Sequence, residues 1–167
     1  VLSMDFDLDP EAYAYLRQLA GRIHAERGGA QQSIQPTALL HEAWARLVRG
    51  SGRYESRAHF LATAARAMRF VMVDRARSRA ALKRDPGLKT TLDGVVGDAG
   101  VVVDLLALEE LLERLAAVDA LCAEIVTMRV FGGLSMEEIA AVTDVSVRTV
   151  YTRWRFARGW LAEQLST

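Results

Sequence analysis

Apolar residues recur at three- and four-residue spacing along most of the chain, and no stretch alternates cleanly between apolar and polar side chains. This spacing gathers apolar side chains on one face of a helix, whereas alternation would mark a strand. The chain has 167 residues, of which 51% are hydrophobic, and this is enough to build a packed core. We therefore expect an all-α fold with little or no sheet.

Proline, glycine and capping residues divide the helical pattern into segments. They predict three helices in the first half of the chain, at 10–28, 36–49 and 56–84. The stretch 85–100 is rich in glycine and predicts a flexible linker, and Val101-Val102-Val103, without a visible partner strand, are expected to lead into the next helix. We predict two small helical domains, 1–84 and 104–167, joined by a linker at 85–103.

Several classes of protein are disfavoured. No apolar run approaches the roughly 18–20 residues that span a bilayer, and the acidic N-terminus is unlike a signal peptide, so we expect a cytoplasmic protein without membrane contact. His41-Glu42 begins like a zinc protease motif, but the second histidine is missing, and no phosphate-binding glycine loop is present. The single cysteine, Cys122, has no disulfide partner. We expect no enzyme, no cofactor and no metal.

Charge is strongly segregated although the net charge is zero. Eight basic residues against two acidic ones lie between Arg66 and Lys89, and eight acidic residues against one basic residue lie between Asp93 and Glu124. Four arginines follow between Val145 and Trp160 with no acidic residue among them. Two basic patches predict two surfaces for a polyanion, the alternative being ordinary solvated helix faces.

The segment from Leu134 to Leu161 carries the strongest local signal. Ser135 and Glu138 form a capping-box pattern that starts a short helix, and Ser146 caps a second one after a turn at Asp144. The small Ala140 and the apolar Val150 suit the close crossing of a helix-turn-helix. Asp144 stands where glycine is usual; aspartate tolerates a left-handed backbone at some cost in stability.

The outward side of the second helix is basic and rich in hydroxyl groups, a composition that suits the major groove of DNA. We predict that it reads DNA through Arg148, Thr149, Tyr151, Thr152, Arg153 and Arg155. The alternative is a charged helix that only faces solvent.

Three segments, at 35–44, 57–69 and 134–161, carry a resemblance that covers nearly all of the chain. The sequence resembles a bacterial RNA polymerase sigma factor of the extracytoplasmic-function (ECF) type. The resemblance implies that the N-terminal domain docks on a coiled coil of the largest polymerase subunit and captures unstacked −10 bases. It also implies that the C-terminal domain reads the −35 element and that the linker threads toward the RNA exit path.

The resemblance assigns roles to residues of this chain. The polymerase-docking helix carries Leu40, Glu42, Ala43, Trp44, Arg46 and Leu47; the alternative for Trp44 is a position wholly in the core. Recognition and melting of the −10 element fall to Arg53, Tyr54, Arg57, Arg66, Arg69, Arg75, Arg77 and Arg79, with Tyr54 stacking on a flipped base. The acidic residues around the linker are expected to keep the free chain from binding DNA.

The expected partners are core RNA polymerase and promoter DNA, and the free protein is expected to be a monomer. Control by an anti-sigma factor stays open. Two other functions also stay open: a helix-turn-helix regulator that works without polymerase, and a helical signalling adaptor that binds only protein.

Thr37 stands in a neutral segment, 35–38, where most relatives carry acidic residues. Pro36 is expected at the first helical position, so Thr37 lies in the first turn, where the helix dipole favours an added anion. We expect a Ser/Thr kinase to activate docking by phosphorylating Thr37. The alternative is that Thr37 only helps to cap the helix.

Overall fold

The structure, a computed structural model, describes residues 6–7, 10–25, 36–50, 53–82, 89–92 and 101–166. The helices are α1 (Pro10–Ala25), α2 (Pro36–Arg49), α3 (Arg57–Ala81), α4 (Leu105–Val118), α5 (Ala120–Gly132), α6 (Met136–Thr143) and α7 (Val147–Leu165). The strands are β1 (Phe6–Asp7), β2 (Arg53–Tyr54), β3 (Lys89–Leu92) and β4 (Val101–Asp104). Helices dominate, and the predicted all-α fold is confirmed.

Local capping explains where the helices begin. α1 and α2 start at Pro10 and Pro36, as predicted, because proline fits the first turn of a helix. Ser56 caps α3 by accepting a hydrogen bond from the His59 amide at 3.1 Å. Asp104 and Asp119 cap α4 and α5 in the same way. Each helix in the second half therefore follows a Ser or Asp that satisfies its free amides.

The expectation for Val101-Val102-Val103 was wrong. These residues form β4, which pairs antiparallel with β3 in the register Lys89↔Asp104 to Leu92↔Val101. Leu92 and Val103 are buried, so the strand pair packs into the core. Three β-branched residues form a strand once a partner lies beside them, and that partner comes from the segment expected to be a flexible linker. A second short pair joins β1 to β2.

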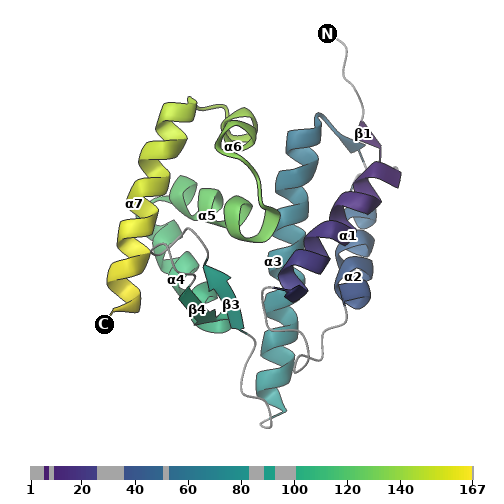
Figure 1. Ribbon diagram of the computed structural model, residues 1–167, viewed down its shortest axis with the longest axis horizontal. Coiled ribbons are helices and arrows are strands. Elements are labelled where there is room, and N and C mark those ends of the chain that lie inside the picture. The colour runs from purple at the N-terminus through teal and green to yellow at the C-terminus, as the bar shows by residue number, and fades with distance from the viewer. Residues whose placement is uncertain are drawn as a thin grey trace.

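α3 lies at the centre of the molecule (Figure 1). In this view α1 and α2 lie on one side of it, and α4, α5 and α6 lie on the other, with α7 beyond α5. α3 packs against helices of both predicted domains, most extensively against α5. The buried side chains of the two halves form one continuous apolar cluster that includes Leu16, Phe60, Met68, Ile125 and Phe131.

Gly132 lies where α5 packs tightly against α3. A Cβ atom placed on Gly132 would lie 2.7 Å from the Cβ of Ala65 and 2.5 Å from a methyl group of Leu134. The Tyr15 hydroxyl on α1 donates a hydrogen bond to the Gly132 carbonyl. The absence of a side chain at Gly132 thus lets three helices meet at one point.

Among the described residues, no helix is both long enough and apolar enough to cross a lipid bilayer.

Candidate nucleic-acid interface

α6 and α7 are joined by a tight turn. The predicted capping box is present: the Glu138 amide donates to the Ser135 hydroxyl at 3.1 Å, and the Ser135 amide donates to the Glu138 carboxylate at 2.8 Å. Asp144 ends α6 with φ 53° and ψ 38°, the left-handed conformation expected for it. Ser146 then caps α7 by accepting from the Thr149 amide at 3.0 Å. These contacts fix the direction in which α7 leaves the turn.

One side of α7 is exposed. Arg148, Tyr151, Thr152 and Arg155 are all exposed, and at 3.6 residues per turn they fall within about one third of the helix circumference. The opposite side packs in the core through Val150, Trp154, Ala157 and Leu161. The structure therefore brings together four of the six residues predicted to read DNA.

Thr149 and Arg153 lie at the edge of that surface. The Thr149 side chain is half-buried, and its hydroxyl lies 2.8 Å from the Ser146 hydroxyl. Arg153 is also exposed, but it forms an ion pair with Asp119, the residue that caps α5. Arg153 thus ties α7 to the start of α5.

The thiol of Cys122 lies beneath this ion pair. It donates a hydrogen bond to the Arg153 carbonyl at 3.6 Å. Burial, together with the nearby Asp119 carboxylate, raises the pKa of Cys122 to about 11, so the thiol stays protonated at neutral pH. Cys122 is thus a buried thiol of the core.

Three arginines of α3 are bound by carboxylates from the second half of the chain. Arg66 donates from Nε and Nη2 to one oxygen of Glu124 at 2.9 and 2.7 Å. Arg69 donates to Glu109 at 2.8 Å and to the buried Thr127 hydroxyl at 2.9 Å.

Arg57, at the first position of α3, donates to Glu138 at 3.1 Å. The basic face of α3 is thus covered in part by acidic residues of α4, α5 and α6.

The remaining predicted arginines of α3 lie further along the helix. Arg75 donates from Nε to Glu42 of α2 at 3.1 Å, and this hydrogen bond raises the pKa of the Arg75 guanidinium. Arg77 is exposed and Arg79 is half-buried. Glu42 and Arg75, assigned to polymerase docking and to DNA, are therefore bound to each other.

Tyr54 is buried. Only 5% of it is exposed, its hydroxyl donates to the Leu47 carbonyl at 3.3 Å, and its ring packs edge-on against Phe60 and His59. Burial raises the pKa of the Tyr54 phenol. In this conformation too little of the ring is exposed for a base to stack on it, although Tyr54 lines a hollow of about 430 Å³ together with His59. The side chain of Arg53 lies outside the described residues.

α2 presents only part of the predicted docking surface. Leu40, Ala43 and Leu47 are buried, so the structure places them in the core rather than on a surface that a partner could reach. Glu42 and Arg46 are exposed.

Trp44 is half-buried against the ring of Tyr13, with 5.3 Å between the ring centroids. It is therefore not wholly a core residue. Thr37 is exposed in the first turn of α2.

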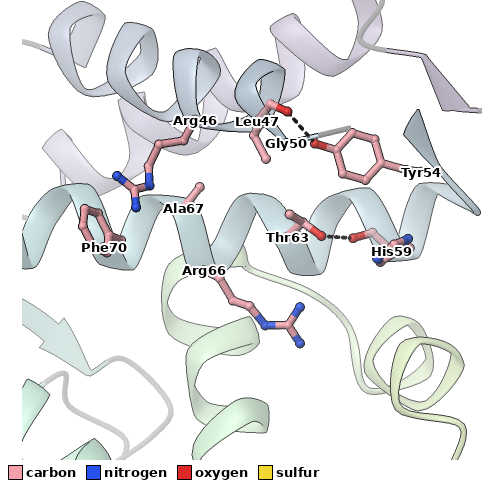
Figure 2. A pocket seen from close by; sticks show the side chains of 9 residues that line it. All are labelled: Arg46, Leu47, Gly50, Tyr54, His59, Thr63, Arg66, Ala67 and Phe70. Atoms are coloured by element: carbon pink, nitrogen blue, oxygen red, sulfur yellow. Dashed lines mark hydrogen bonds between the residues drawn. The ribbon is translucent and has the colours of Figure 1, made fainter. Parts of the chain in front are cut away.

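Phe70 was not singled out from the sequence. It is 48% exposed, and the guanidinium carbon of Arg46 lies 3.4 Å from its ring centroid, as in a cation–π contact. Beside it lies a hollow of about 430 Å³, whose lining includes His59 and Arg66. Figure 2 shows Arg46 beside Phe70, and Arg66 extended toward α5. An aromatic residue on the polar side of a basic helix is a signal that could have identified Phe70.

Glu109, Glu124 and Glu138 were not predicted as partners of the α3 arginines. Their signal was the acidic stretch that follows the basic one, but charge alone does not show which groups pair. Among the described residues, no group of three or more His, Cys, Asp or Glu side chains could hold a metal ion.

Comparison with known proteins identifies one family. No curated protein and no solved structure matched the chain. The family model described as "ECF sigma factor" matches residues 6–167. This family consists of transcription factors that associate with RNA polymerase and act in promoter-specific initiation. Because the match covers nearly the whole sequence, the chain belongs to the ECF sigma factor family.

Proposed function

We propose that this chain binds core RNA polymerase through α2, contacts the −10 region through α3, and reads the −35 element through α7. Membership of the family supports a role in promoter-specific transcription.

The exposed side of α7 carries the proposal. It offers two guanidinium groups, Arg148 and Arg155, with Tyr151 and Thr152 between them. Arginine can donate two parallel hydrogen bonds to guanine or to a phosphate, and a tyrosine ring can pack against a sugar or a thymine methyl group. Because the buried side of α7 is held by the core, this polar side stays directed outward.

Fewer residues of α2 are available for polymerase docking than expected. Of the six residues predicted to dock, Glu42, Trp44 and Arg46 are accessible, and they combine two charges with one aromatic ring. Partly buried aromatic and arginine side chains are the types that contribute most to protein interfaces. The buried apolar residues of α2 keep that surface rigid.

The melting role of Tyr54 requires a change of conformation. A flipped base could stack on the ring only after the ring leaves its contacts with Phe60 and His59. Before the Tyr54 ring moves, the arginines of α3 and the exposed ring of Phe70 can contact a single DNA strand.

Run-off transcription tests the function directly. The full chain is added to core polymerase with a library of random promoter sequences, and the initiated transcripts are sequenced. We expect initiation at sites that share two elements at fixed spacing. The R148A/R155A variant should still bind core polymerase in a pull-down but lose preference at the upstream element. Failure of the wild-type chain to bind core polymerase or to start transcription would contradict the proposal.

A further inference from the structure

Three guanidinium groups of α3 bind carboxylates of the same chain. Glu124 accepts two hydrogen bonds from Arg66, and Glu109 and Glu138 bind Arg69 and Arg57. All three carboxylates come from helices C-terminal to the strand pair β3–β4. Arg57 and Arg69 stand 12 positions apart on α3, a distance of about 18 Å at the rise of a helix.

We propose that these carboxylates mask the DNA-binding arginines of α3 in the free chain, so that the C-terminal half competes with DNA phosphates for the same guanidinium groups. The inference rests on the DNA-binding role proposed above for α3. It adds a closed state of the free protein, which must open before α3 can hold DNA.

The chemistry of the contact supports competition. A guanidinium group binds carboxylate and phosphate oxygens through the same planar set of N–H donors. Two donors of Arg66 are directed at one oxygen of Glu124. Arg69 is more enclosed: its side chain is 20% exposed and donates to both Glu109 and Thr127. The Arg57 and Arg66 side chains remain 56% and 46% exposed, so a phosphate can approach them, but it can bind the donors already in use only by displacing the carboxylates.

Close packing stabilises the closed state in addition to the ion pairs. Gly132 lets α5 lie directly on Ala65 of α3, and the Tyr15 hydroxyl binds the Gly132 carbonyl from α1. These contacts join the two halves without any ionised group. Core polymerase or promoter DNA can therefore open the chain only by binding the open state more tightly than the closed one.

The masking is confined to the first half of α3. Arg75 lies in the second half of α3 and is bound by Glu42 of α2. Like α3, α2 precedes β3–β4 in the sequence. Separation of the two halves would therefore free Arg57, Arg66 and Arg69 and leave the Arg75 pair intact. A test of the masking should therefore substitute the carboxylates of the C-terminal half and leave Glu42 in place.

The main experiment compares two variants of the full chain with the same change in charge. E109Q/E124Q/E138Q removes the three masking charges, and glutamine at position 138 can still complete the capping box. E110Q/E113Q/E137Q removes three exposed charges from neighbouring positions. Affinity for a fluorescently labelled single-stranded oligonucleotide is measured by anisotropy without polymerase.

We expect the masking variant to bind the oligonucleotide about tenfold more tightly than the control variant, which is the combined effect expected of three partly exposed ion pairs. Adding Arg66→Ala and Arg69→Ala to the masking variant should remove this gain. Equal affinity of the two glutamine variants would overturn the proposal. So would a gain that persists without the two arginines.

A second variant disrupts the same contact without changing charge. Gly132→Ala places a methyl group against Ala65, so it should separate α5 from α3, raise the radius of gyration measured by small-angle X-ray scattering, and tighten oligonucleotide binding. A Gly132→Ala chain that keeps its helical circular dichroism and gains radius of gyration, yet binds the oligonucleotide as weakly as the wild type, would overturn the proposal.

The polymerase assays separate this inference from the proposed function. If the wild-type chain initiates transcription and the two glutamine variants bind the oligonucleotide equally, the masking is wrong and the sigma function stands. If the masking variant binds more tightly and the chain never engages polymerase, the masking stands and the proposed function is wrong.

Discussion

Ser135 and Glu138 each bind the backbone amide of the other, at 3.1 and 2.8 Å, and the second oxygen of Glu138 binds Arg57 of α3. One carboxylate therefore starts α6 and joins it to α3. Ser135→Ala should lower the free energy of unfolding by about 1 kcal/mol, measured by urea denaturation. Glu138→Gln should cost less, because glutamine can replace glutamate in a capping box. A larger loss in Glu138→Gln than in Ser135→Ala would show that the contact with Arg57 matters more for stability than the cap.

Arg148 and Arg153 should behave differently although both were predicted to read DNA. Arg148 is exposed, so Arg148→Ala should cost about 1–3 kcal/mol of promoter binding at one base position if it contacts a base edge. Arg153 binds Asp119, so Arg153→Ala should lower unfolding free energy by about 0.2–1 kcal/mol. Promoter-library profiles and denaturation curves for both variants check this. An altered base preference in Arg153→Ala at unchanged stability would reverse the assignment.

Asp144 holds a left-handed backbone at the turn between α6 and α7. Asp144→Gly should raise the unfolding free energy by about 0.5–1 kcal/mol, because glycine adopts this conformation without a steric cost. Asp144→Ala is the matched control and should lower it, since alanine has neither the small size of glycine nor a polar side chain for the turn. Thermal unfolding followed by circular dichroism ranks the three chains. Equal stability of the glycine and alanine variants would mean that backbone strain at Asp144 is negligible.

Substitutions of Tyr54 test whether this buried residue also captures a flipped base. Tyr54→Ala should lower the unfolding free energy by about 3 kcal/mol, as expected for loss of a buried ring, whereas Tyr54→Phe should change it by about 1 kcal/mol or less. If the ring captures a base, Tyr54→Phe should still form open complexes and Tyr54→Ala should do so only on a pre-melted template. Permanganate footprinting reports melting. Normal melting by folded Tyr54→Ala would leave Tyr54 with a packing role alone.

Changes at Thr37 test whether phosphorylation controls binding to core polymerase. It is exposed in the first turn of α2, where no acidic residue is present. Phosphorylation adds about −1.5 to −2 charges near the helix N-terminus, so phosphorylated protein and Thr37→Glu should bind core polymerase more tightly than unmodified protein. Thr37→Val serves as the uncharged control. Equal, tight binding by all of these forms would rule out activation through Thr37.

The parts of the fold that depend on neighbouring residues were predictable. The starts at Pro10 and Pro36, the caps at Ser135 and Ser146 and the turn at Asp144 follow from local backbone chemistry, and the structure has them where the sequence put them. These signals act within a few residues, so the surrounding fold does not alter them.

The parts that depend on distant pairing were not predictable. β4 needed a partner from 89–92, a segment with no apolar alternation, and the contact between Arg66 and Glu124 joins positions 58 residues apart. For the candidate site, the sequence identified the basic helices but not that Tyr54 and Leu47 would be buried. Whether an apolar residue of an amphipathic helix lies in the core or against a partner depends on packing that a periodic pattern does not contain.

The pairing of Lys89 with Asp104 also sets how far the two halves of the chain can move apart. While β3 and β4 are paired, the ends of the segment 89–104 lie side by side, so the segment adds almost nothing to the reach of the tether. Once unpaired and extended, it could span about 50 Å. We therefore expect the paired strands to limit how widely α3 and α7 can be spaced along a promoter, and their separation to lengthen the connection between the two helices.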